Sequence, residues 1–182
     1  MMELKHKRLA ALWDHIKFSD RAKKIKNPID GAFILSSIFS ISAYASKKSE
    51  SIETKFSKQT AHKLMVKLKG VRDQFSQLDL EFTSKYKNLD VCYMNTKKFK
   101  IDVDRKFITP ETAMFIKIFL TIDDYFTHLY MARTGGELTE SETLELRKAC
   151  LDQLIRLLNE VNQICLSFHK ARKSIGKSLW AI

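Results

Sequence analysis

The stretch KKFKIDVDRKFITPETAMFIKIFLTIDDYFTHLYMARTGG, residues 97–136, decides the fold class of this 182-residue chain. At its start Phe99, Ile101 and Val103 alternate with charged side chains, and this period of two predicts a half-buried strand. Thr109 then offers a hydroxyl cap and proline follows in the first turn, so we expect a helix from 110 to about 133. That helix is apolar on nearly every face, which predicts the central helix of a mainly helical protein.

Downstream of Gly135-Gly136, which ends this helix, a second long helix is expected. Thr139-Glu140-Ser141-Glu142 forms a capping box at its start. Its apolar residues recur at alternating spacings of three and four and form a seam that needs a partner helix: Leu151, Leu154, Leu158, Val161, Cys165 and Phe168. Packing against helix 110–133 in the same chain and pairing with a second copy are both open.

Upstream, the pattern predicts a second strand and three further helices. Ile52, Thr54 and Phe56 alternate with polar residues, so 51–57 is expected to be a short strand, followed by a helix that Ser57 caps and that runs to about 85. Residues 3–18 have helical spacing. The apolar run 31–45 is too short and too rich in serine to span a membrane comfortably, and it predicts a buried core helix.

The charge of +11 is unevenly placed along the sequence. The whole excess of positive charge lies in residues 1–106, because residues 107–182 carry equal numbers of basic and acidic side chains. Such a surplus points to a polyanionic partner, and its location assigns the binding face to the N-terminal two-thirds.

Motifs for catalysis and for metal binding are missing from the sequence. It contains no HExxH, no glycine-rich phosphate loop and no GxSxG, and its five histidines are scattered. Cys150 and Cys165 lie in helical apolar patterns, where a reduced, buried thiol is the ordinary interpretation. We therefore expect a non-enzymatic protein of the reducing cytoplasm, without cofactor or metal.

A binding hypothesis follows from the strand joined to a capped helix. Proteins that read DNA with a two-stranded β-ribbon lay alternate strand side chains in the major groove, and helix N-termini beside the ribbon bind phosphate. With 51–57 as the companion strand, the predicted DNA contacts are Lys55, Lys98, Lys100, Arg105, Lys106 and Thr139. A solvated strand face is the alternative for these lysines.

Two stretches carry a resemblance to a known family. Residues 108–161, with Asp123-Asp124-Tyr125 and the turn from Ala132 to Gly136, together with SIETKFSKQTAHKLMVKLKG (51–70), resemble a protein family encoded in integrating conjugative elements and conjugative plasmids. That family includes a transfer activator of IncC-type plasmids, which is a ribbon-helix-helix regulator. The resemblance implies a ribbon-helix-helix core and control of conjugative-transfer genes.

Together these observations predict a mainly α protein with a short β-ribbon: a basic N-terminal helical arm over 1–48, and a ribbon-helix-helix-like DNA-binding and dimerisation core with extended helices over 49–182. The expected function is a sequence-specific, double-stranded-DNA-binding activator of transcription, as a homodimer in the cytoplasm, with RNA polymerase as a further candidate partner. The rival hypothesis is a helical adaptor or a nonspecific DNA-binding accessory protein. A peripheral membrane factor using 1–45 is a third.

Overall fold

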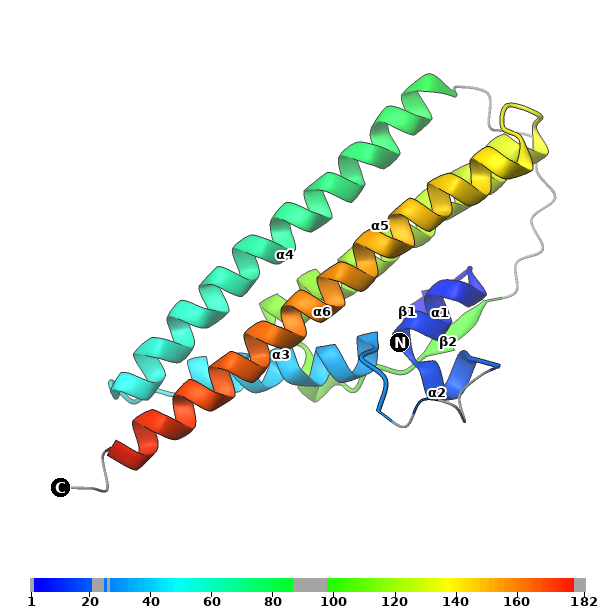
Figure 1. Cartoon of the computed structure of the whole chain (residues 1–182). Coiled ribbons are helices and arrows are strands. Elements are labelled where there is room, and N and C mark those ends of the chain that lie inside the picture. Colours follow the sequence, from blue (N-terminus) through cyan, green and yellow to red (C-terminus); the bar gives the residue numbers. More distant parts are fainter. Residues whose placement is uncertain (1, 21–24, 26, 87–97, 179–182) are drawn as a thin grey trace.

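Three long helices form the body of the protein in a computed structural model that describes residues 2–20, 25, 27–86 and 98–178. They are α4 (Ile52–Lys85), α5 (Pro110–Thr134) and α6 (Glu140–Ser178). α4 and α5 run in the same direction and α6 runs antiparallel to both, so that α4 begins near the end of α6 (Figure 1). The predicted mainly helical fold is confirmed.

α5 is the central helix, as its sequence predicts. The hydroxyl of Thr109 accepts a hydrogen bond from the backbone N–H of Thr112, and the Thr112 hydroxyl accepts one from the N–H of Thr109, at 3.3 and 2.7 Å. This reciprocal cap and Pro110 fix the start of the helix. Four of its aromatic side chains are essentially inaccessible to solvent: Phe115, Phe119, Tyr125 and Phe126.

The apolar seam of α6 is used inside the chain. All six of its residues are buried against the other helices: Leu151, Leu154, Leu158, Val161, Cys165 and Phe168. Of the two open alternatives, packing within the chain is therefore the one observed, and the seam leaves no apolar surface for a second copy.

The strand predicted at 51–57 is wrong, because this segment is the start of α4. Ser51 caps the helix and its hydroxyl accepts a hydrogen bond from the N–H of Thr54. The buried positions that follow are spaced by three and four, and include Thr54, Ser57, Ala61 and Leu64. Ile52, which a strand would bury, is 65 % exposed.

A two-stranded antiparallel ribbon exists, but its partner strand is at the N-terminus. β2 (Phe99–Ile101) pairs with β1 (Met2–Leu4), with Glu3 opposite Lys100. Leu4 and Ile101 turn inward and are buried, as the predicted alternation requires. The ribbon is thus formed within one chain and is only three residues long on each side.

The helix predicted over 3–18 is divided into β1, α1 (Lys7–Trp13) and α2 (His15–Phe18). Asp14 breaks it: its backbone is extended, and its side chain caps α2 by accepting from the N–H of Lys17. As a consequence Ile16 is exposed instead of buried. The prediction for 31–45 is confirmed by α3 (Gly31–Ala45), whose inner face is buried.

The N-terminal segment is fastened to α5 by a buried carboxylate. Asp123 accepts hydrogen bonds from the backbone N–H groups of Lys5 and His6 at 2.9 and 3.1 Å. Trp13 of α1 packs edge-on against Phe119, with ring centroids 4.9 Å apart. Residues 2–13 therefore share one hydrophobic core with the long helices.

Candidate nucleic-acid interface

The largest set of lysines without a counter-charge lies on α4. Because α4 turns its apolar positions to the core, its opposite side carries four exposed lysines that form no ion pair with any residue the structure describes; we call them the α4 lysine face: Lys55, Lys58, Lys63 and Lys69. The first and last are 14 positions apart, which is about 21 Å along a helix. A row of this kind can follow a phosphate backbone.

The end of α6 extends this positive surface. Phe56 of α4 stacks on Phe168 of α6, with ring centroids 5.6 Å apart, so the start of one helix lies beside the end of the other. The last turns of α6 add the exposed or half-exposed cations Lys170, Arg172 and Lys173, and residues 161–175 contain no acidic side chain. Both helices thus contribute positive charge to the same end of the bundle (Figure 1).

Two carboxylates in this region are already paired, whereas Glu50, just before the cap of α4, is exposed and forms no ion pair with a described residue. Glu53 accepts from Arg172 at 3.1 Å, and Glu160 forms an ion pair with Lys67. Burial lowers the pKa of His169, and the charges of Arg172 and Lys173 lower it further. The potential at this end is therefore positive.

The other end of the bundle is acidic. The last turns of α4, the loop after α5 and the first turns of α6 carry seven carboxylates, which outnumber the five cations there (Arg72, Lys85, Arg133, Arg147 and Lys148): Asp73, Asp79, Glu81, Glu137, Glu140, Glu142 and Glu145. The bundle is consequently polarised, with its excess positive charge where α4 begins and α6 ends.

The structure separates the predicted DNA contacts instead of bringing them together. Lys55 is on the α4 lysine face, whereas Lys98 and Lys100 are on the ribbon, which lies beside α1 and α2 (Figure 1). Both ribbon lysines are exposed, but Lys98 forms an ion pair with Glu3 of β1 at 3.0 Å. A carboxylate therefore stands on the same outer face of the ribbon.

The remaining predicted contacts have acidic neighbours. Arg105 and Lys106 lie in the single turn after β2 (Arg105–Phe107), and Lys106 pairs with Asp104 at 2.9 Å. The hydrogen bond from Lys106 lowers the pKa of Asp104.

Thr139 does cap α6, but a side chain of the protein already fills this helix start. Its hydroxyl and its backbone N–H both donate to the carboxylate of Glu142, at 2.7 and 2.8 Å. These hydrogen bonds lower the pKa of Glu142, so the carboxylate is charged. A phosphate at this position would meet that charge.

The α4 lysine face could not be recognised from the sequence as long as 51–57 was interpreted as a strand, because Lys55 then lies outside the helix. In a strand Lys55 belongs to a different surface from Lys58 and Lys63, whereas in one continuous helix all three lie on the solvent side. The serine cap at Ser51 was the signal that distinguishes the two interpretations.

Neither a metal site nor a reactive cysteine is found in the described part of the chain. No group of three His, Cys, Asp or Glu side chains within it could hold a metal ion. Cys150 and Cys165 are buried free thiols, as predicted, and burial raises the pKa of each to about 12. The Nδ1 atom of His128 in α5 is hydrogen-bonded to Oδ1 of Asp79 in α4, at 2.6 Å.

Comparisons with known proteins gave no match: no protein-family model fits the chain, and no curated protein or solved structure is similar to it. None of the helices, within the residues described, is long and apolar enough to cross a membrane.

Proposed function

We propose that this protein binds double-stranded DNA through phosphate contacts made by the α4 lysine face, and that it acts as a regulator of transcription. The observation that carries the proposal is the row of four lysines without ion-pair partners beside the basic end of α6. Lysines that meet phosphates release condensed counterions, so binding should weaken steeply with salt. With four phosphates neutralised, the slope of log affinity against log salt is about −3.6.

The test is a pair of variants that remove equal charge. Lys55→Gln with Lys58→Gln should weaken binding to a labelled duplex and reduce the magnitude of the salt slope by about 2. Lys117→Gln with Arg156→Gln removes two exposed cations of α5 and α6 elsewhere on the bundle and should leave the slope near its original value. Equal effects in the two pairs would mean that only the net charge matters, which contradicts the proposal.

Sequence-specific readout is the finer part of the proposal. β2 followed by α5 and α6 has the strand-helix-helix order of the ribbon-helix-helix regulators that the family resemblance implies, and the resemblance alone suggests conjugative-transfer genes as targets. Lys98 and Lys100 project from the outer face of the ribbon, where lysine can donate to guanine. The nearby Glu3 limits this contribution, so we expect the α4 lysine face to supply most of the affinity.

Competition separates a regulator from a nonspecific accessory protein. For a regulator, a promoter fragment should stay bound in an excess of unrelated duplex, and Lys98→Gln with Lys100→Gln should abolish that preference while keeping the salt slope near that of the original protein. Equal affinity for all duplexes, unchanged in the ribbon variant, would assign the accessory role.

The homodimer stays a prediction, although both of its sequence-based arguments have lost their support. The ribbon closes within one chain, and the seam of α6 is buried in the same chain. Sedimentation at micromolar concentration, without and with duplex, determines whether one or two copies bind.

A further inference from the structure

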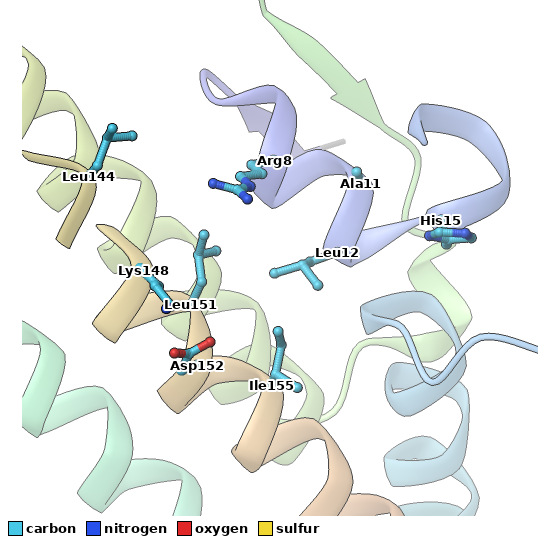
Figure 2. Close-up of a pocket in the computed structure, with 9 residues that line it drawn as sticks. All are labelled: Arg8, Ala11, Leu12, His15, Leu144, Lys148, Leu151, Asp152 and Ile155. Carbon is cyan, nitrogen blue, oxygen red and sulfur yellow. The ribbon is translucent and has the colours of Figure 1, made fainter. Parts of the chain in front are cut away.

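A cleft separates α1 from the first half of α6. It encloses about 510 Å³, and its walls include Arg8, Leu12 and His15 on one side and Leu144, Lys148 and Ile155 on the other. Figure 2 shows the side chain of Arg8 extending from α1 toward α6. A second hollow of about 320 Å³ shares Arg8 and adds Arg147.

Three cations beside this cleft form no ion pair with a described residue, although a carboxylate lines each space: Asp152 the cleft, and Asp20, which pairs with Lys7, the second hollow. Neither Arg8 nor Arg147 forms an ion pair with a carboxylate in the parts of the chain that the structure describes, and the same is true of Lys148. Arg147 is half-buried and lies over the ring of Phe126, 5.1 Å from its centroid. Burial lowers the pKa of Arg147, and the neighbouring guanidinium of Arg8 lowers it further. Like charges held together in this way attract an anion.

The other walls are apolar. Leu144 and Ile155 are 51 % and 40 % exposed, so their side chains face the cleft and solvent instead of the core. The Nε2 atom of His15 is buried and has no hydrogen-bond partner among the described residues. Asp152 is the single carboxylate in the lining. The cleft thus combines the unpaired guanidinium of Arg8, with that of Arg147 in the adjoining hollow, an apolar wall and a free polar atom.

We propose that this α1–α6 cleft binds a small organic anion that has a carboxylate, sulfonate or phosphate head and an apolar body. Guanidinium groups are suited to such heads because they bind two oxygens at once. The volume is within the range of small-molecule sites, about 300 to 1,000 Å³. The cleft lies at the start of α6, away from the α4 lysine face, so this proposal does not depend on DNA binding.

The test uses anilinonaphthalene sulfonate, a fluorescent anion with an aromatic body, as the probe. We expect saturable binding to the full chain. Arg8→Gln should weaken it about tenfold, or about 1.4 kcal/mol, because the variant loses a hydrogen bond to a charged group. Arg8 is exposed, so the variant should fold normally, and a melting curve checks this. The control is Lys117→Gln on α5, which loses the same charge from an exposed position and should bind the probe normally.

Competition then tests both halves of the proposed ligand. Decanoate should displace the probe, whereas inorganic phosphate and decanol, each with one of the two features, should displace it far less well. Ile155→Ser should weaken decanoate without changing the weak effect of phosphate. The proposal is overturned if a folded Arg8→Gln variant binds the probe as before, if Lys117→Gln weakens it equally, or if decanol or phosphate competes as well as decanoate.

Discussion

Gly31, the first residue of α3, is packed against Trp13, and this contact makes a sharp prediction for Gly31→Ala. A Cβ atom at this position would lie 2.8 Å from Cε3 and 3.0 Å from Cα of Trp13. The tryptophan is only 2 % exposed and its ring is held against Phe119, so it cannot move aside easily. The methyl group would therefore force the junction of α1 and α3 apart.

Two opposing effects determine the magnitude. Alanine is better than glycine in a helix by roughly 0.5–1 kcal/mol, whereas inserting atoms into a packed core costs about 1–3 kcal/mol. We expect a net destabilisation of about 1–2 kcal/mol. The matched control is Gly70→Ala in the middle of α4, where a Cβ would meet nothing within 4 Å. It should stabilise the protein by roughly 0.5–1 kcal/mol.

Urea unfolding followed by circular dichroism measures both changes. Heating should give the same order, with a shift in Tm of about 2–4 °C for each kcal/mol in a chain of this size. The two substitutions are chemically identical, so opposite signs can come only from their surroundings. If Gly31→Ala proves as stabilising as Gly70→Ala, Trp13 does not pack against α3 as described.

Three further predictions concern other parts of the core. Burial lowers the pKa of His6 from 6.5 to about 4, so between these pH values the unfolded chain binds more protons than the folded protein. The free energy of unfolding should therefore keep its full His6 contribution above pH 6.5 and fall by about 1–2 kcal/mol at pH 5, allowing for the partial exposure of the ring. Urea midpoints of His6→Gln should lack this part of the decline. Leu154→Ala in the buried seam should lower the free energy of unfolding by about 2–5 kcal/mol, whereas Leu144→Ala at an exposed position should lower it by less than about 0.5 kcal/mol. Similar losses in the two variants would contradict the packing of α6. Asp123→Ala removes the acceptor of two backbone N–H groups and should lower the free energy of unfolding by about 1–3 kcal/mol. Amide hydrogen exchange should rise first in the N-terminal segment. Uniform protection along the chain would count against this anchor.

The helices could be predicted from sequence because their signals are local. The Thr109 cap, Pro110 and the capping box at Thr139 all act within a few residues, and the structure places the starts of α5 and α6 there. The intrachain use of the α6 seam was left open for a physical reason: an apolar stripe shows that a partner is needed, but not which chain supplies it.

The ribbon partner could not be predicted, since pairing between distant segments leaves little local trace. Met2 lies opposite Ile101, and a three-residue strand is too short to show a period of two.

The wrong prediction of a strand at 51–57 has the opposite cause, a local pattern that fits two structures. Three alternating apolar or β-branched residues fit a strand, yet Thr54 and Phe56 also fit a helix whose first turn is capped, and the cap determined the outcome.

The polarised bundle limits how the protein can meet a polyanion. Glu140 and Lys170 of α6 are 30 positions apart, about 45 Å along the helix, which exceeds the roughly 34 Å of one duplex turn. If the α4 lysine face binds DNA as proposed, the field of the protein should turn this basic end toward the duplex, because carboxylates outnumber cations at the other end. In that orientation Thr139 and the carboxylate it holds point away from the duplex, and the six residues predicted from the sequence cannot act as one site. The α1–α6 cleft is lined by α1 and the first half of α6, away from the α4 lysine face, so it should stay open to a small anion while DNA occupies that face.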